Sequence, residues 1–414
     1  MKAAFLFLYL SGVTQLYAQS DNSYVLLVSF DGFRHDYVSA FGAPHFKSLM
    51  KEGAYAKALI PCFPSKTFPN HYTLVTGLYP GHHGLVDNAF YDPARKVFYS
   101  MKNRERVADP YFYGGKPIWQ LAKEHGIKSA SYFWAGSEVP LTHPDYYYPY
   151  NELVPDTARI AEVLCWLKLP LDQRPHFVAL YFSSPDHEGH LYGPSAEETK
   201  RAVLHADELL GMLMAGIAKT KLPINLIVVS DHGMKELKKE ESTYIFLPEL
   251  FNVNDTTIKV SNGGTQAHLY LNRKNNTDSL YSFLKAKSEN FVVMKKEDFP
   301  KRWHYDNPRS GDIIIIANEG FYISDRDRAS FVKTLKKNET FGVHGYDPSE
   351  TKDMWGIFYA KGPNIKKGIV IEPFQNIHVY PLMARILGLP LPPIDGSVDA
   401  LNLIYNNKRN KGSE

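Results

Sequence analysis

Three short apolar segments, each followed closely by an aspartate, constrain the fold of this chain more than any other feature. The segments are YVLLVSF at 24–30, HFVALYFS at 176–183 and INLIVVS at 224–230, followed by Asp31, Asp186 and Asp231. Runs of this length, rich in β-branched and aromatic residues, are typical of strands buried on both faces of a parallel sheet. Ligands of open α/β sheets bind where the carboxyl ends of such strands meet. The pattern therefore predicts an α/β fold with three acids at one sheet edge.

The segments between these strands predict how the rest of the chain is organised. Residues 117–125 and 196–218 have the apolar spacing of helices, as expected for a mostly parallel sheet flanked by helices. From about residue 245 to 340 the chain becomes strand-rich without this alternation, which predicts a smaller inserted lobe. The charged residues 235–241 are expected to form a solvated loop. We interpret residues 20–414 as a single catalytic domain with this insertion.

Composition excludes several classes of protein. Hydrophobic residues make up 44% of the chain and charged residues 22%, which is ordinary for a globular protein. The formal net charge of +3 is too small for a broad cationic face, so no stable nucleic-acid complex is expected. A small-molecule partner is expected instead.

The N-terminal residues indicate export. Residues 1–19 combine Lys2, an apolar run and a small-residue region ending near Ala18, the pattern of a signal peptide. No later segment has the apolar length of a membrane span, so we expect a secreted protein. The two cysteines, Cys62 and Cys165, allow one disulfide at most, and this low number favours a bacterial periplasm or cell surface.

Acids and histidines at the predicted strand ends form a candidate metal site. Asp186 and His190 are four residues apart, so a helical turn would put both side chains on one face. Asp231 and His232 are adjacent at a strand end, where both can turn to one site. Each residue alone is as well explained as a turn former or a helix cap. The joint set, completed by Asp31 and by His344 from a late loop, suits zinc, with manganese or iron also allowed by ligand type.

The segment SKTFPNHYTLVTG at 65–77 supplies a candidate nucleophile. Pro69 fits the first position of a helix, which puts Thr67 near its cap. Thr67 could simply cap this helix, but a hydroxyl there also lies beside free backbone amides that suit a phosphoryl oxygen. A threonine hydroxyl is a poor nucleophile at neutral pH unless metal coordination lowers its pKa. The predicted nucleophile therefore needs the predicted metal site.

Six separated motifs resemble one known family. They are FDGFR (30–34), KTFPNHYTLVTGLYP (66–80), DNAFYDP (87–93), PDHEGHLYGP (185–194), SDHGM (230–234) and GVHGYDP (342–348). Their order and chemistry resemble the nucleotide pyrophosphatase/phosphodiesterases, a branch of the alkaline phosphatase superfamily. The resemblance runs from about residue 24 to the C-terminus and implies an alkaline-phosphatase-like fold.

The resemblance also implies a mechanism with two zinc ions. One ion matches the ligands Asp31, Thr67, Asp231 and His232, and the other matches Asp186, His190 and His344. Thr67 would attack phosphorus and form a covalent threonyl intermediate, which is then hydrolysed. Asn88 would donate a hydrogen bond to a phosphate oxygen. The implied products are nucleoside 5'-monophosphates.

Several residues bear on the substrate. The nucleophile segment contains Lys66 but no arginine to meet the extra charge of a monoester, which favours diesters. Phe68, Trp134 and Tyr150 resemble the family's aromatic slot for a nucleobase, although each ring could equally be core. Ala89 stands where some animal relatives have a lysine, which argues against a strong triphosphate preference. Two alternatives remain: a choline- or glycerol-type phospholipid phosphodiesterase, whose slot could bind a quaternary ammonium, and an inactive metal-binding homologue.

Overall fold

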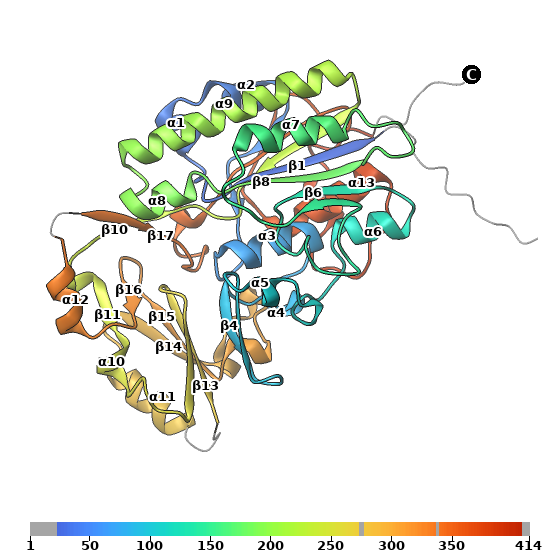
Figure 1. Ribbon diagram of the computed structural model, residues 1–414. Helices are drawn as coiled ribbons and strands as arrows, with labels where there is room; N and C mark the ends of the chain where they lie inside the picture. The colour runs from blue at the N-terminus through green and yellow to red at the C-terminus, as the bar shows by residue number, and fades with distance from the viewer. Residues whose placement is uncertain (1–22, 273–276, 337–338, 408–414) are drawn as a thin grey trace, which may run out of the picture.

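A mixed sheet of eight strands forms the centre of the larger part of the molecule (Figure 1). The computed structural model describes residues 23–272, 277–336 and 339–407, so the predicted signal peptide lies outside the described residues. The sheet has the strand order β19 (Ile369–Ile371), β2 (Ala54–Ala56), β18 (Phe358–Lys361), β9 (Ile224–Val229), β1 (Tyr24–Phe30), β8 (Phe177–Phe182), β6 (Ser129–Tyr132) and β7 (Tyr146–Tyr148). Only β18 runs antiparallel to its neighbours, which confirms the predicted mostly parallel α/β class.

The three predicted acid-ending strands lie side by side at the centre of this sheet. Strand β1 pairs in parallel with β8 on one side and with β9 on the other. All seven residues of β1 are buried, as its apolar sequence requires. Since the three strands run in the same direction, their carboxyl ends meet at one edge, where the aspartates follow.

Helices cover both faces of the sheet, and the side chains of β1 contribute to the apolar core on each face. Val25 and Leu27 belong to one apolar core, while Leu26 and Val28 belong to the other, because successive side chains of a strand point to opposite faces. The first core includes residues of α3 (Thr67–Thr76), α6 (Ile118–Glu124) and α13 (Val379–Leu387). The second includes residues of α1 (Tyr37–Phe41), α2 (Pro44–Glu52), α7 (Asp156–Trp166) and α9 (Glu197–Thr220).

The remaining short elements connect these layers. They are α4 (Pro80–His83), α5 (Arg104–Val107), α8 (Asp186–Tyr192), the pair β4 (Ala89–Asp92) and β5 (Val97–Ser100), and the pair β3 (Leu59–Ile60) and β20 (Phe374–Gln375). The predicted helices at 117–125 and 196–218 correspond to α6 and α9.

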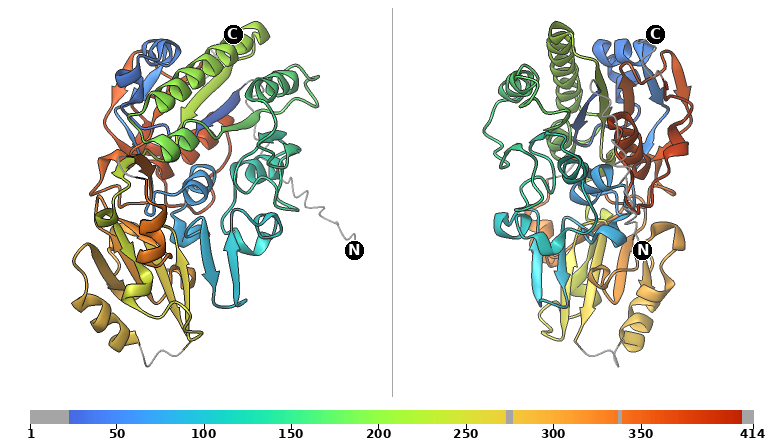
Figure 2. Two further views of the ribbon diagram at one scale, coloured as in Figure 1. Left: turned by 60° about the vertical axis from the view of Figure 1, so that its left-hand side comes forward. Right: turned by 90° about the vertical axis from the view of Figure 1, so that its right-hand side faces the viewer.

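The strand-rich segment folds around a smaller core of its own, below the large sheet in Figures 1 and 2. Its antiparallel sheet has the order β12 (Ile258–Asn262), β13 (Gln266–Leu271), β15 (Ile313–Ala317) and β14 (Phe291–Lys295). It also contains β11 (Tyr244–Phe246) paired with β16 (Tyr322–Ser324), and the helices α10 (Leu247–Leu250), α11 (Thr277–Ala286) and α12 (Arg328–Thr334). We call this part the lobe.

The charged segment 235–241 was wrongly expected to be a loop. Lys235–Lys238 forms strand β10, which pairs antiparallel with β17 (Thr340–Val343). Its partner lies about a hundred residues away along the chain, so no local pattern reveals the pairing.

Two further features answer the expectations for disulfides and membrane spans. Cys62 is buried, Cys165 is exposed and neither forms a disulfide. Of the helices that the structure describes, none combines the length and the apolar character needed to cross a bilayer.

Candidate active site

The predicted metal-ligating residues come from five separate segments and meet beyond the carboxyl ends of β1, β8 and β9. Asp31 directly follows β1, and Asp231 and His232 follow β9. Asp186 and His190 lie one turn apart on α8, as the four-residue spacing predicts. Close packing is needed here: a Cβ on Gly32, whose φ is +65°, would lie 2.8 Å from the Cα of Asp186. The backbone N–H of Gly32 donates to Oδ1 of Asp231 at 3.3 Å.

His232 is surrounded by the first group of predicted ligands. Its Nε2 lies 3.0 Å from Oδ2 of Asp231 and 3.4 Å from Oδ1 of Asp31. The hydroxyl of Thr67 is 3.2 Å from the same nitrogen. All four side chains are buried, so these donor atoms face one another without bulk water between them.

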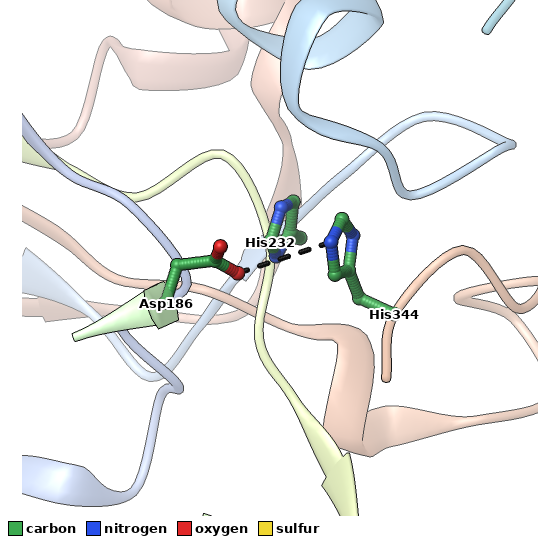
Figure 3. Close-up of side chains that lie close together, drawn as sticks. All are labelled: Asp186, His232 and His344. Atoms are coloured by element: carbon green, nitrogen blue, oxygen red, sulfur yellow. Dashed lines mark ion pairs between the residues drawn. The ribbon is translucent and has the colours of Figure 1, made fainter. Parts of the chain in front are cut away.

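The second group surrounds Asp186. Its Oδ1 lies 3.5 Å from Nε2 of His190 and 3.8 Å from Nε2 of His344. The two histidine nitrogens are themselves 3.1 Å apart. Figure 3 shows Asp186, His232 and His344 converging on one point, and the His232 and His344 rings stack with centroids 3.6 Å apart. The two groups therefore adjoin each other through His232.

The polar chemistry of these groups fits cations. Among the described residues, Oδ1 of Asp31, Oδ1 of Asp186 and Oδ2 of Asp231 are buried without a hydrogen-bond partner. Burial and the neighbouring charges of Asp231 and Asp186 raise the pKa of Asp31 well above its usual range. Uncompensated buried carboxylates are costly, and a divalent cation between them would remove that cost. The donor set of carboxylates and imidazoles is one that zinc accepts.

The three histidines are oriented as metal ligands are. Nδ1 of His190, His232 and His344 lies 2.7, 2.9 and 2.8 Å from the carbonyl oxygens of Gly342, Gly233 and Ser65 respectively. A carbonyl oxygen can only accept a hydrogen bond, so Nδ1 of each ring carries the hydrogen. Nε2 of each neutral ring therefore carries the lone pair and faces the site. Backbone contacts of this kind fix the tautomer of histidines that bind metals.

The electrostatics of the histidines differ with their surroundings. Burial lowers the pKa of His344 well below its usual range, and the charges of His232 and Lys66 add to this effect. Burial also disfavours the charged form of His232, but the adjacent Asp231 carboxylate outweighs it and raises the pKa of His232. For Asp231, burial opposes ionisation, but the charges of His232 and His71 hold its pKa well below its usual range.

Thr67 is the first residue of α3, with Lys66 at the cap position. Pro69 is therefore the third helical residue and not the first, as the sequence had suggested. The hydroxyl of Thr67 lies 3.2 Å from Nε2 of His232. The side chain of Asn88 lies against this helix start, since its Oδ1 accepts the N–H of Phe68 at 2.8 Å.

A pocket opens beside Thr67, and six of its thirteen lining residues carry rings. Phe68, Trp134 and Tyr150 all contribute to it. Trp134 is 1% exposed and donates from Nε1 to the carbonyl oxygen of His71, so it forms a fixed wall. Tyr150 is 36% exposed and lies at the surface of the pocket. The other lining residues are His71, Met101, Arg104, Val107, Phe133, Ala135, Gly136, Glu138 and Tyr181.

Sequence reasoning missed several of these residues. His71 lies one helical turn after Thr67, with Nδ1 3.3 Å from Oδ2 of Asp231, and its i+4 spacing could have revealed it. Tyr181 donates to Oδ2 of Asp31 at 2.7 Å, but inside an apolar strand nothing marks it out. The ion pair of Arg104 with Glu138 at the pocket joins segments that carry no common motif.

Comparison with known proteins identifies the family. The family model "Type I phosphodiesterase / nucleotide pyrophosphatase" matches residues 25–347, more than half of the chain. The chain belongs to this family. The match spans the strand ends, the Thr67 helix, the lobe and His344.

Curated relatives in this family include animal enzymes. The chain is 38% identical over 400 residues to human ectonucleotide pyrophosphatase/phosphodiesterase family member 1, covering 92% of this chain and 42% of that protein. It is 35% identical over 413 residues to venom phosphodiesterase 2 of Crotalus adamanteus, covering 96% and 49%. The chain thus spans about half the length of the curated relatives it matches.

Solved structures in the family have the same fold. An inactive threonine-to-alanine variant of murine ectonucleotide pyrophosphatase/phosphodiesterase 5, in complex with AMP, aligns with a TM-score of 0.84 and 32% identity. The human protein of the same name aligns with a TM-score of 0.84 and 34% identity. Each match covers 93% of this chain and 100% of the other, which confirms the predicted fold family.

Proposed function

We propose that this chain is a two-zinc phosphodiesterase that hydrolyses nucleotide phosphodiester or phosphoanhydride bonds and releases nucleoside 5'-monophosphates. One observation carries the proposal. The Thr67 hydroxyl lies between a buried set of carboxylates and imidazoles on one side and a ring-lined pocket on the other. A nucleophile in this position can reach the phosphorus of a substrate whose base occupies the pocket.

Each of the two groups of predicted ligands would bind one zinc ion. Asp31, Asp231, His232 and Thr67 would hold one zinc, and Asp186, His190 and His344 the other. Bound zinc would lower the pKa of the threonine hydroxyl and neutralise charge that develops on the phosphoryl oxygens. His232 belongs to both clusters of donor atoms, so two ions bound there would be neighbours.

The residues of the chain then supply the remaining steps. The Thr67 oxygen bonds to phosphorus as the bond from phosphorus to the in-line leaving oxygen breaks, so the leaving alcohol or phosphate departs and a threonyl diester remains. Water then bonds to phosphorus as the bond to the Thr67 oxygen breaks, which releases the nucleoside 5'-monophosphate and restores the Thr67 hydroxyl. Asn88 stabilises the transition state by donating from Nδ2 to a non-bridging oxygen, because its Oδ1 already accepts the Phe68 N–H.

The pocket favours a nucleoside over an acyl chain. Phe68 and Tyr150 offer ring faces, and stacking contributes about 1–3 kcal/mol per base with little discrimination between bases. The AMP bound to the related murine protein supports this interpretation. The names of the relatives, ectoenzymes and venom enzymes, support a location outside the cell.

The nucleophile is tested by Thr67→Ala, with Thr67→Ser as the matched control. We expect the alanine variant to keep its fold and its zinc but to lose at least about a thousandfold in turnover, since the covalent step has no substitute. The serine variant retains a hydroxyl and should keep measurable turnover. The assay is hydrolysis of the nitrophenyl ester of thymidine 5'-monophosphate. Near wild-type turnover of the alanine variant would show that the covalent mechanism is wrong.

The substrate class is tested by competition in the same assay with AMP and with phosphocholine. We expect AMP to inhibit at much lower concentration, because only AMP has a base to stack in the pocket. The opposite order would favour the phospholipid-type alternative, and bound zinc without any turnover would favour an inactive homologue.

A further inference from the structure

A buried set of polar side chains connects strand β13 of the lobe to Asn88. Asp87 lies at its centre and is 1% exposed. Its Oδ2 accepts a hydrogen bond from Nε2 of Gln266 at 2.6 Å and lies 3.1 Å from Nε2 of His268. Its Oδ1 accepts the backbone N–H of Asn88 at 2.6 Å. The carboxylate thus holds two residues of the lobe with one oxygen and Asn88 with the other.

The lobe residues that hold Asp87 are themselves fixed. The amide oxygen of Gln266 accepts a hydrogen bond from the Thr265 hydroxyl, and Nδ1 of His268 lies 3.0 Å from the carbonyl oxygen of Ser310. Thr265, Gln266 and His268 are fully buried. Buried networks in which every polar atom has a partner are rigid, because breaking any contact leaves an unpaired group. Asp87 therefore has one defined position.

Asp87 also remains a carboxylate in this setting. Burial alone would raise its pKa, but the hydrogen bond and charge of His268, with the charge of Lys66, hold the pKa below its usual range. An ionised acceptor makes shorter and stronger hydrogen bonds than a neutral one, which agrees with the short contact to the Asn88 N–H.

A second contact joins the lobe to the residue before Thr67. The Nζ of Lys66 donates to the carbonyl oxygens of Gly263 and His344 at 2.6 and 2.8 Å. Gly263 lies in the turn between β12 and β13. Gly345, the residue after His344, packs against Lys66 and Thr265. No side chain fits there, since a Cβ on Gly345 would lie 2.1 Å from Oγ1 of Thr265 and 2.4 Å from Cε of Lys66. The turn, Lys66 and the His344 loop are therefore packed together.

We propose that Asp87, Gln266 and His268 are positioning residues for the hydrolysis, and that strand β13 of the lobe sets the geometry of Asn88 through Asp87. The inference rests on the function proposed above, in which Asn88 donates to a phosphate oxygen. It gives the lobe a part in the reaction, because a donor misplaced by about 1 Å can lose about a hundredfold in rate.

The test is a double-mutant cycle that combines Gln266→Met with Asn88→Ala. Methionine keeps the volume of glutamine but cannot hydrogen-bond Asp87. We expect Gln266→Met to lower kcat by about tenfold or more with KM and zinc content nearly unchanged. The melting temperature should fall as well, because the substitution removes two buried hydrogen bonds, from Gln266 to Asp87 and from Thr265 to Gln266. In the Asn88→Ala background the same substitution should have almost no further effect, because residues that act through one another are not additive.

Asp312→Ala is the matched control. It removes the hydrogen bond that the N–H of Leu271, on the same strand β13, donates to Oδ2 of Asp312. Asp312 does not hydrogen-bond Asp87, so kcat should stay unchanged. His268→Asn serves as a second variant if Gln266→Met folds poorly. The proposal would be overturned if Gln266→Met lowered kcat by the same factor in the wild type and in Asn88→Ala. A wild-type kcat for Gln266→Met would overturn it as well. A fast Asn88→Ala variant would overturn it too, while the hydrolase proposal is judged separately by Thr67→Ala.

Discussion

At the scale of single residues, the candidate site contains three carboxylates, each with one buried oxygen that has no hydrogen-bond partner. Asp186 is the clearest case, because its Oδ1 is buried, lacks a hydrogen-bond partner and faces the Nε2 atoms of His190 and His344. An amide in its place would keep the shape and lose the charge. The charge, and not the shape, is therefore the property to test.

We predict that Asp186→Asn loses zinc while the fold persists. A neutral amide binds zinc far more weakly than a carboxylate, so the variant should keep about one zinc per chain or less after dialysis, against about two for the wild type, if each ion has its own ligands. Metal analysis after dialysis measures this. Asp207→Asn is the matched control: Asp207 is also a buried carboxylate, but it holds the N–H of Phe46 and the ring of His45. An unchanged zinc content in Asp186→Asn would contradict its role as a ligand.

At the scale of elements, the sequence predicts whatever is encoded locally. Strands β1, β8 and β9 follow their apolar runs to within a residue or two, because burial on both faces leaves no other sequence pattern. The Asp186 and His190 pair followed from helical spacing alone. The sequence did not predict strand β10, since its charged residues become a strand only by pairing with β17.

The residues that line the pocket were likewise predicted only where a local motif marks them. Phe68 and Tyr150 were predicted from motifs, whereas Tyr181 and Arg104 have no signal in their own segments. Their roles depend on tertiary packing that brings distant segments together. The sequence thus predicted the acids, histidines and threonine that the fold brings together, and few of the groups that surround them.

The packing of α3 against α4 should make stability depend on pH through His83. Its Nδ1 accepts the N–H of Leu85 at 3.2 Å, and its Nε2 lies 3.0 Å from the Thr73 hydroxyl, so only a neutral ring fits both contacts. Burial accordingly lowers the pKa of His83 from 6.5 to about 3. The unfolded chain therefore binds this proton first as the pH falls. The stability that His83 contributes is complete above about pH 6.5 and is lost progressively down to about pH 3.

We predict that His83→Gln flattens this part of the pH dependence. One such group changes the free energy of unfolding by at most about 1.4 kcal/mol per pH unit, so the variant should lose less stability than the wild type on acidification by up to that amount. Urea unfolding at several pH values, with chelator in every sample so that metal binding does not contribute, measures the difference. Parallel pH dependences would show that His83 does not titrate in this way.

At the scale of the whole molecule, the ligand set joins distant parts of the chain. Asp31 follows the first strand of the large sheet, whereas His344 follows β17, which pairs with β10 beside the lobe. A cation bound between them therefore links the sheet edge to the segment that returns from the lobe. Without it, three buried carboxylate oxygens remain without hydrogen-bond partners in one region of the described structure.

We predict that chelation destabilises the whole chain and that zinc restores it. A ligand present at about a thousand times its Kd stabilises the folded state by about 4 kcal/mol, so removal should lower the melting temperature by about 5 °C or more. Differential scanning calorimetry of the chelated and reloaded protein measures the shift. Magnesium should restore much less than zinc, because three of the seven ligands are imidazoles, which magnesium disfavours. Equal recovery with magnesium would indicate a site built for a harder cation, and no shift on chelation would mean that the clustered carboxylates are stable without metal.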